Sequence, residues 1–257
     1  MEIPDVGLKT ENSAVPPEPR AWGFWATSLF GLAAVAVSFF VQLLAIIIYV
    51  ANYIMSNRNA DFAGATQAVD AHLGLIVAVS TILEVAVGIP VIAGFVRLRR
   101  LQVREYLGLK RVKAKTLLTW LGLNFIYLVV AEGIRYFVKL PQSQNDVAWY
   151  NTSVSLPLFF AAVVVFAPLF EETLFRGFMF RGYSESRAGP VTAIILTAAF
   201  WALLHVTVSA YDMAVIFAGG LVLGFARWKT GSLWTTLAMH ALWNAIAFVS
   251  IAATTSR

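Results

Sequence analysis

Ionisable side chains occur in this sequence where only apolar ones are expected. Glu171, Glu172 and Arg176 directly follow the uncharged run 147–170, in a stretch long enough to form a membrane helix. Ionised groups are costly in hydrocarbon and seldom occur there without a partner or a task. Glu172 and Arg176 have the spacing of a salt bridge along one helix face, whereas Glu171 points about 100° away from Glu172. Glu171 is therefore predicted to be free to face a cavity.

Two of the three histidines, His205 and His240, lie in later apolar segments. Trp201 precedes His205 by four residues and Asn244 follows His240 by four, so each pair shares one helix face. A buried carboxylate can serve as a general base toward water, and imidazole or amide groups can donate hydrogen bonds to a developing oxyanion. These residue types, spread over three helices, predict an active site inside the membrane.

Two alternatives to this interpretation stay open. Glu171, His205 and His240 are also a plausible zinc set, although the sequence has no HExxH pair and the Asn244 amide suits an oxyanion better than zinc. We therefore predict no cofactor, with zinc as the alternative. In the second alternative, the two glutamates and the arginine form a buried charge network that only holds helices together.

The elements that must position these residues are apolar helices. Of the 257 residues, 59% are hydrophobic and 13% charged, and the mean hydropathy is +0.74. A soluble domain carries roughly a quarter charged residues, and crossing the hydrocarbon takes about 20 apolar residues in a helix. We predict an all-α, polytopic membrane helix bundle of about seven spans, at residues 24–53, 73–96, 116–138, 156–181, 190–206, 213–228 and 233–253. Short connections make the last four spans antiparallel neighbours, so their polar residues can converge.

The distribution of charge predicts how the spans are oriented. With seven spans, 14 of the 19 Lys and Arg residues lie on one side, including those of the loop 97–115 and Arg227, and four lie on the other. The positive-inside rule makes the basic side cytoplasmic. This predicts a bacterial inner or plasma membrane protein with a cytoplasmic N-terminus and an external C-terminus. Attraction to anionic lipid explains the +5 net charge, so no nucleic-acid partner is predicted.

Along the chain we predict four parts. Residues 1–20 are polar and proline-rich and form a disordered cytoplasmic tail. Residues 21–138 form N-terminal membrane helices, 139–155 an external loop, and 156–253 the helix bundle that carries the site. Within that bundle, Pro168 predicts a kink beside the carboxylates, and Gly220 and Gly224 predict a close contact between helices.

Three motifs in this order resemble those of the CPBP family, which contains type II CAAX prenyl endopeptidases and their bacteriocin-processing relatives, also called the ABI family. The motif EExxxR is matched by Glu171, Glu172 and Arg176, FxxxH by His205 with Trp201 in place of the usual phenylalanine, and HxxxN by His240 and Asn244. The resemblance covers roughly residues 156–253, and the first three spans carry no part of it.

The resemblance implies an intramembrane endopeptidase, a hydrolase of the glutamate protease kind. Glu171 and His205 would position and deprotonate a water molecule, and His240 and Asn244 would donate hydrogen bonds to the oxyanion. Glu172, Arg176 and Trp201 would support them. The partner implied is a membrane-associated peptide or protein substrate, which reaches the site from the cytoplasm and the lipid bilayer.

Two further functions are weighed against this one. The same polar residues could assemble a non-catalytic membrane scaffold that regulates a sensor or a bacteriocin system. A proton-coupled transporter could use Glu84, Glu132 and Glu171 as a relay, but it would leave Asn244 without a purpose.

Overall fold

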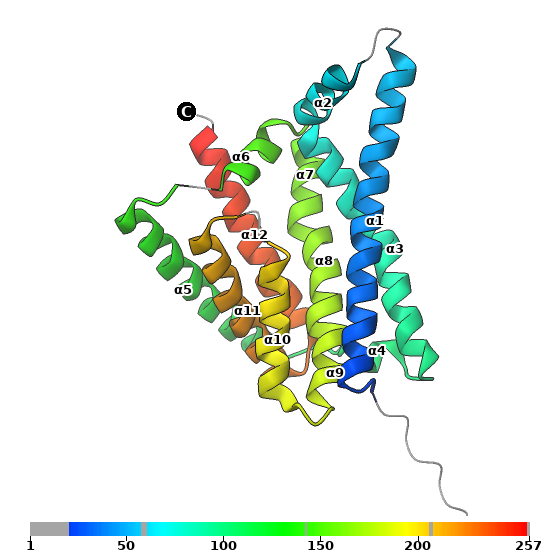
Figure 1. Ribbon diagram of the computed structural model, residues 1–257. Coiled ribbons are helices and arrows are strands. Elements are labelled where there is room, and N and C mark those ends of the chain that lie inside the picture. Colours follow the sequence, from blue (N-terminus) through cyan, green and yellow to red (C-terminus); the bar gives the residue numbers. More distant parts are fainter. Residues whose placement is uncertain (1–20, 58–60, 142, 206–207, 256–257) are drawn as a thin grey trace, which may run out of the picture.

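The computed structural model describes residues 21–57, 61–141, 143–205 and 208–255, and every regular element within these ranges is helical. The predicted tail 1–20 lies outside the described residues. Six helices are long and apolar enough to cross a membrane, which confirms the all-α polytopic bundle. In chain order they are α1 (Phe24–Ser56), α3 (Leu73–Leu98), α5 (Ala114–Val138), a composite helix (Leu156–Ser184), α11 (Ala210–Thr230) and α12 (Leu233–Thr255) (Figure 1).

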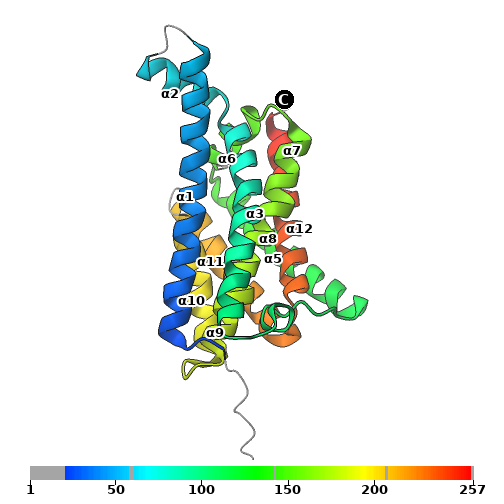
Figure 2. The ribbon, with the colours of Figure 1, turned by 90° about the vertical axis from the view of Figure 1, so that its right-hand side faces the viewer.

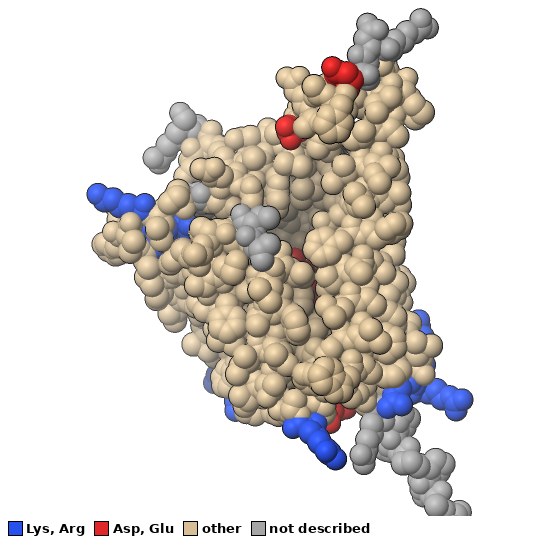
Figure 3. Space-filling model, in the orientation of Figure 1, with Lys and Arg blue, Asp and Glu red and all other residues tan. Residues whose placement is uncertain are grey.

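The outer surface of the bundle suits a lipid environment. Large apolar side chains such as Phe40 on α1 and Phe125 on α5 are exposed. Figure 3 shows a broad band without charge, with most of the visible Lys and Arg residues at one end of the molecule. These surfaces, with the six long apolar helices, make the chain an integral membrane protein.

The composite helix Leu156–Ser184 carries the two glutamates, and its hydrogen-bond register changes along its length. It consists of α7 (Leu156–Ala161), the π-helical segment η1 (Ala162–Phe166), α8 (Ala167–Glu172), a second π-helical segment η2 (Thr173–Met179) and α9 (Phe180–Ser184). In its most apolar 18-residue stretch, 50% of the residues are buried, whereas the value for the corresponding stretches of α1 and α5 is 17%. It is therefore the central helix of the bundle. Below it is called the site helix.

The site helix lies between two groups of elements. On one side α1 and α3 run along each other in both ribbon views (Figures 1 and 2) and contact it. Gly88 of α3 allows this approach, because a Cβ atom there would lie 2.4 Å from the Phe170 ring. On the other side it contacts α10 (Gly189–Leu203), α11 and α12.

The helix α10 is shorter than predicted. Residues 190–206 are predicted to cross the membrane, but α10 has 15 residues, about 22 Å at 1.5 Å per residue, against about 30 Å of hydrocarbon. It forms a hairpin with α11, and the C-terminal end of α10 lies well short of the end of α1 that is uppermost in both ribbon views (Figures 1 and 2). Hydropathy overestimated the helix because the apolar run continues past the point where the chain turns, at Leu204 and His205.

Glycines on α11 let the two helices of this hairpin approach closely, as their spacing predicts. A Cβ atom at Gly220 would lie 3.0 Å from Cα of Ala198, and one at Gly224 would lie 3.1 Å from the Ile194 side chain. The approach also brings the Gly220 carbonyl next to the site helix.

Short helices occur in connections that are predicted to be loops. They are α2 (Phe62–Ala71), α4 (Val103–Tyr106) and α6 (Gln144–Asn151), the last within the predicted external loop 139–155. The connection after α4 is docked on the bundle, because Leu233 N donates to Gly108 O at 2.9 Å. The side chains of Asp61 and Ser143 cap the N-terminal ends of α2 and α6. Such caps are local sequence signals that a hydropathy profile does not contain.

Candidate active site

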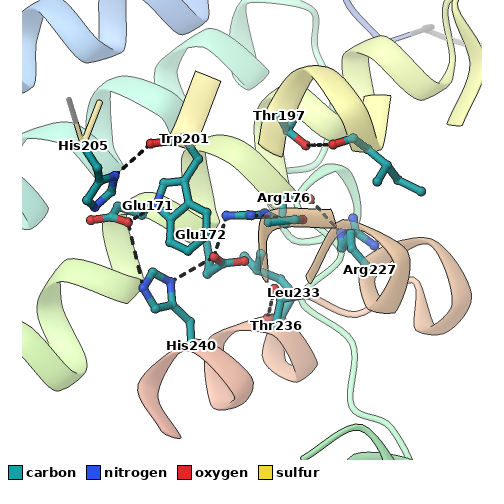
Figure 4. A network of polar contacts seen from close by, with 12 residues as sticks. Glu171, Glu172, Arg176, Thr197, Trp201, His205, Arg227, Leu233, Thr236 and His240 are labelled. Atoms are coloured by element: carbon teal, nitrogen blue, oxygen red, sulfur yellow. Dashed lines mark hydrogen bonds and ion pairs between the residues drawn. The ribbon is translucent and has the colours of Figure 1, made fainter. Parts of the chain in front are cut away.

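A buried ionic cluster lies at the centre of the site. Glu172 and Arg176 are fully buried, and the predicted salt bridge between them is present, with Nη1 of Arg176 2.8 Å from Oε1 of Glu172. The same oxygen lies 3.0 Å from Nδ1 of His240 on α12. The cluster therefore joins the site helix to α12, and one carboxylate oxygen receives hydrogen bonds from two helices (Figure 4).

The main chain of the second π-helical segment is also held from outside. Arg227 of α11 donates from Nε to the Arg176 carbonyl at 2.8 Å and from Nη2 to the Leu107 carbonyl at 3.3 Å. A return from π-helical to α-helical bonding passes over one carbonyl, and such a group needs a donor when it is buried. Arg227, which the charge distribution places on the cytoplasmic side, is 4% exposed and contacts backbone acceptors.

Glu171 points away from this cluster, as its helical position predicts. Its Oε2 accepts a hydrogen bond from the indole N–H of Trp201 on α10 and lies 4.0 Å from Nε2 of His240. Its side chain is 23% exposed, whereas that of Glu172 is fully buried. Figure 3 shows a hollow between α10 and α1 with acidic atoms at its bottom. A water molecule can therefore reach Glu171.

His205 lies just past the end of α10, in the turn of the hairpin. Its Nδ1 lies 2.8 Å from the Trp201 carbonyl, and its ring centroid lies 5.6 Å from that of the indole. A carbonyl only accepts hydrogen bonds, so Nδ1 carries the hydrogen and Nε2 keeps a lone pair. The short α10 places this imidazole in the same group of side chains as Glu171, as Figure 4 shows.

The two nitrogens of His240 face different glutamates. Glu172 accepts hydrogen bonds from Arg176 and from Nδ1 of His240, so Nδ1 carries a hydrogen. In the neutral ring Nε2, on the Glu171 side, would then have a lone pair. With Nδ1 carrying a hydrogen, Nε2 is a hydrogen-bond donor only when the ring is the imidazolium ion.

Asn244 contacts the main chain of the site helix. Its Nδ2 donates to the Val163 carbonyl in η1 at 2.7 Å. One amide hydrogen is thus used to hold α12 against the site helix, and Nδ2 keeps a second hydrogen. The sequence predicts this side chain as an oxyanion donor but contains no signal for its contact with Val163.

The side chains of the zinc alternative are not gathered as metal ligands. Among the residues that the structure describes, no three His, Cys, Asp or Glu side chains are placed to hold a metal ion. Nδ1 of His205 and Nδ1 of His240 are both engaged with protein acceptors, which leaves their Nε2 atoms for chemistry with Glu171.

Glu84 and Glu132, the other members of the proposed relay, differ in their surroundings. Glu84 on α3 is 9% exposed, accepts a hydrogen bond from the Ser38 hydroxyl of α1 and interacts electrostatically with Glu171. Glu132 on α5 is about half exposed and pairs with Arg135 at 3.4 Å. Glu84 is thus a second carboxyl group near the site, whereas Glu132 belongs to a separate cluster.

Residues 153–246 match the family model described as Rce1-like, type II CAAX prenyl endopeptidase Rce1-like. The matched segment begins just before α7 and ends within α12, so it contains all three motifs. It covers a little over a third of the chain and leaves out α1, α3 and α5. Neither the curated proteins nor the solved structures gave a match. The match confirms the resemblance predicted from the motifs.

Proposed function

We propose that this chain, whose residues 153–246 belong to the CPBP family of type II CAAX prenyl endopeptidase-like membrane proteases, is an active intramembrane endopeptidase. It would cleave peptides or protein tails that reach it along the membrane. The observation that carries the proposal is the meeting of groups from three helices: Trp201 of α10 donates to Glu171, and His240 of α12 lies 4.0 Å from the same oxygen. The Glu171 side chain is 23% exposed, so the group is accessible to solvent.

Glu171 and His205 activate the water. The Glu171 carboxylate and the Nε2 lone pair of His205 are both acceptors, so together they can hold the two protons of one water molecule. Glu171 takes a proton as the water oxygen attacks the carbonyl carbon of the peptide bond. It returns this proton to the leaving amine, since one group can serve as base and then as acid.

His240 stabilises the tetrahedral intermediate. The imidazolium between Glu172 and Glu171 directs Nε2–H toward the position where the oxyanion forms. This departs from the sequence prediction, in which the donors are neutral. The free amide hydrogen of Asn244 supplies a second donor. An essential donor of this kind contributes about 3–4 kcal/mol to the rate, as measured in other hydrolases.

Glu172 and Arg176 keep His240 in place. The salt bridge fixes the Glu172 oxygen that receives Nδ1–H, and so fixes the tautomer and the direction of the ring. Arg176 also donates to the Gly220 carbonyl at 3.3 Å, which connects this cluster to α11. The charge network that could hold helices together is thus, in this proposal, the support of the active site.

Membranes from cells that express the parent protein or Glu171→Gln would be compared by peptide mass spectrometry. Glutamine keeps the shape of the side chain but cannot accept the proton, so peptides produced by the parent should be absent from the variant. His205→Ala should show the same loss. Identical peptide profiles in all three, with equal amounts of folded protein, would contradict proteolysis and favour a non-catalytic scaffold.

A further inference from the structure

Trp201 stands where the motif FxxxH has phenylalanine, and its indole N–H is used. It donates to Oε2 of Glu171, a contact that a phenylalanine ring has no atom to make. The Trp201 side chain lies near the end of α10 and is 2% exposed. Among the described residues, Trp201 is the hydrogen-bond donor recorded for this carboxylate.

The indole ring is fixed by contacts on several sides. The guanidinium carbon of Arg176 lies 4.6 Å from the ring centroid, an arrangement that attracts a cation to the ring. The ring centroids of His240 and Trp243 lie 5.0 Å and 5.9 Å away in edge-on orientations. The ring therefore cannot turn without disturbing Arg176 and His240, and its N–H stays directed at Glu171.

The charged and titratable groups around Glu171 come from several packed elements: Glu172 and Arg176 on the site helix, His240 on α12, His205 after α10 and Glu84 on α3. Arg176 donates its side-chain hydrogen bonds to Glu172 and to the Gly220 carbonyl, not to Glu171. The neutral Trp201 N–H is thus the donor that acts directly on Glu171.

We propose that Trp201 is a positioning residue that fixes the Glu171 carboxylate in the direction of the water between His205 and His240. The inference rests on the proposed function, because its consequence is catalytic: without the indole N–H, the carboxylate would be free to turn away from the water. The occupied oxygen also leaves the other oxygen of Glu171, Oε1, to receive the proton of the water.

The first test does not depend on activity. In the full chain with isotopically labelled tryptophan, the indole N–H resonance that is missing from Trp201→Phe identifies Trp201. A donor bonded to a carboxylate resonates downfield, so Glu171→Gln should move this resonance upfield and leave that of Trp243 in place. An unchanged Trp201 resonance would overturn the inference.

The second test is cleavage of a fluorogenic, lipid-anchored peptide mixture in vesicles. Trp201→Phe should lower kcat about tenfold, the effect of losing one hydrogen bond to the base, and leave KM close to that of the parent. Trp243→Phe, which alters a ring that packs on Trp201 but makes no recorded contact with Glu171, should keep the parent kcat.

The outcomes of the two tests separate the inference from the proposed function. A kcat that is unchanged in Trp201→Phe, or that falls equally in Trp243→Phe, would overturn the inference while proteolysis stands. A parent protein that cleaves no peptide would overturn the proposed function, and the resonance of Trp201 would then decide alone whether its N–H holds Glu171.

Discussion

The Asn244 side chain donates its hydrogen bond to the backbone carbonyl that a proline leaves without a partner. In η1, the N–H of Ala167 bonds the Ala162 carbonyl, five residues back. The next N–H along the chain would bond the Val163 carbonyl in the same register, but position 168 is proline, which has none. Nδ2 of Asn244 takes its place at 2.7 Å. The predicted effect of Pro168 on the site helix is therefore compensated from α12.

This relationship predicts coupling between Asn244 and Pro168. Asn244→Ala should lower the free energy of unfolding by about 1–3 kcal/mol, the cost of leaving a buried acceptor unsatisfied. In a Pro168→Ala background the backbone regains an N–H, so the same change should cost clearly less. The free energy of unfolding would be measured in mixed micelles for the parent, the two single variants and the double variant. Equal costs of Asn244→Ala in the two backgrounds would contradict the relationship.

The buried salt bridge should be far more important for stability than an exposed one of the same spacing. Arg176→Met leaves the fully buried Glu172 without its cation, and the free energy of unfolding should fall by about 3–5 kcal/mol. Arg181 and Glu185 provide the matched control, because they are also four residues apart but about 40% exposed. Arg181→Met should cost less than about 1 kcal/mol. Similar losses in the two variants would contradict a buried salt bridge between Glu172 and Arg176.

The stability of α6 should depend on pH through Asp146. Burial raises the pKa of this carboxyl above its ordinary value of 3.8, and the nearby Asp212 adds to the rise, while Ser143, His205 and Arg135 oppose it. The folded chain then binds the proton more tightly than the unfolded chain, so the contribution is present below pH 3.8 and is lost as the pH rises through the raised pKa.

Asp146→Asn removes this titration. Its unfolding free energy relative to the parent should therefore increase as the pH is raised from acid to neutral. The unfolding free energies of the variant and the parent would be measured in micelles at several pH values. A difference that stays constant over this range would mean that burial of α6 does not raise the pKa of Asp146.

Cleavage should not require a metal. The proposed chemistry uses the Glu171 carboxylate and the Nε2 atoms of His205 and His240 directly, so activity of the purified protein should persist after treatment with a strong chelator and dialysis. Metal analysis of the same sample provides the control for removal. Loss of activity that is restored by zinc would favour the zinc alternative.

Hydropathy was sufficient to predict most of the bundle. The predicted starts at residues 24, 73, 156 and 233 agree with those of α1, α3, α7 and α12, because charged or polar residues border the apolar runs there. The spacing of Glu172 and Arg176 was sufficient to predict their salt bridge. Both predictions depend on properties that are local in the sequence.

The predictions that failed concern depth and tertiary partners. The end of α10 could not be read from an apolar run that continues beyond it, and the contact of Arg227 with the Arg176 carbonyl was not predicted. The π-helical registers and the partner of Asn244 were not predicted either. Each depends on which carbonyl lacks a donor in the folded bundle, and no sequence window contains that information.

The early end of α10 also has a consequence for the surrounding lipid. Peptide groups outside a helix are stable at membrane depth only when protein encloses them or solvent reaches them. Leu204 and His205, past the end of α10, provide such groups. On this flank we expect the bilayer to thin or to admit a column of solvent as far as His205. The fold itself would then bring water into the otherwise apolar interior, where hydrolysis consumes it.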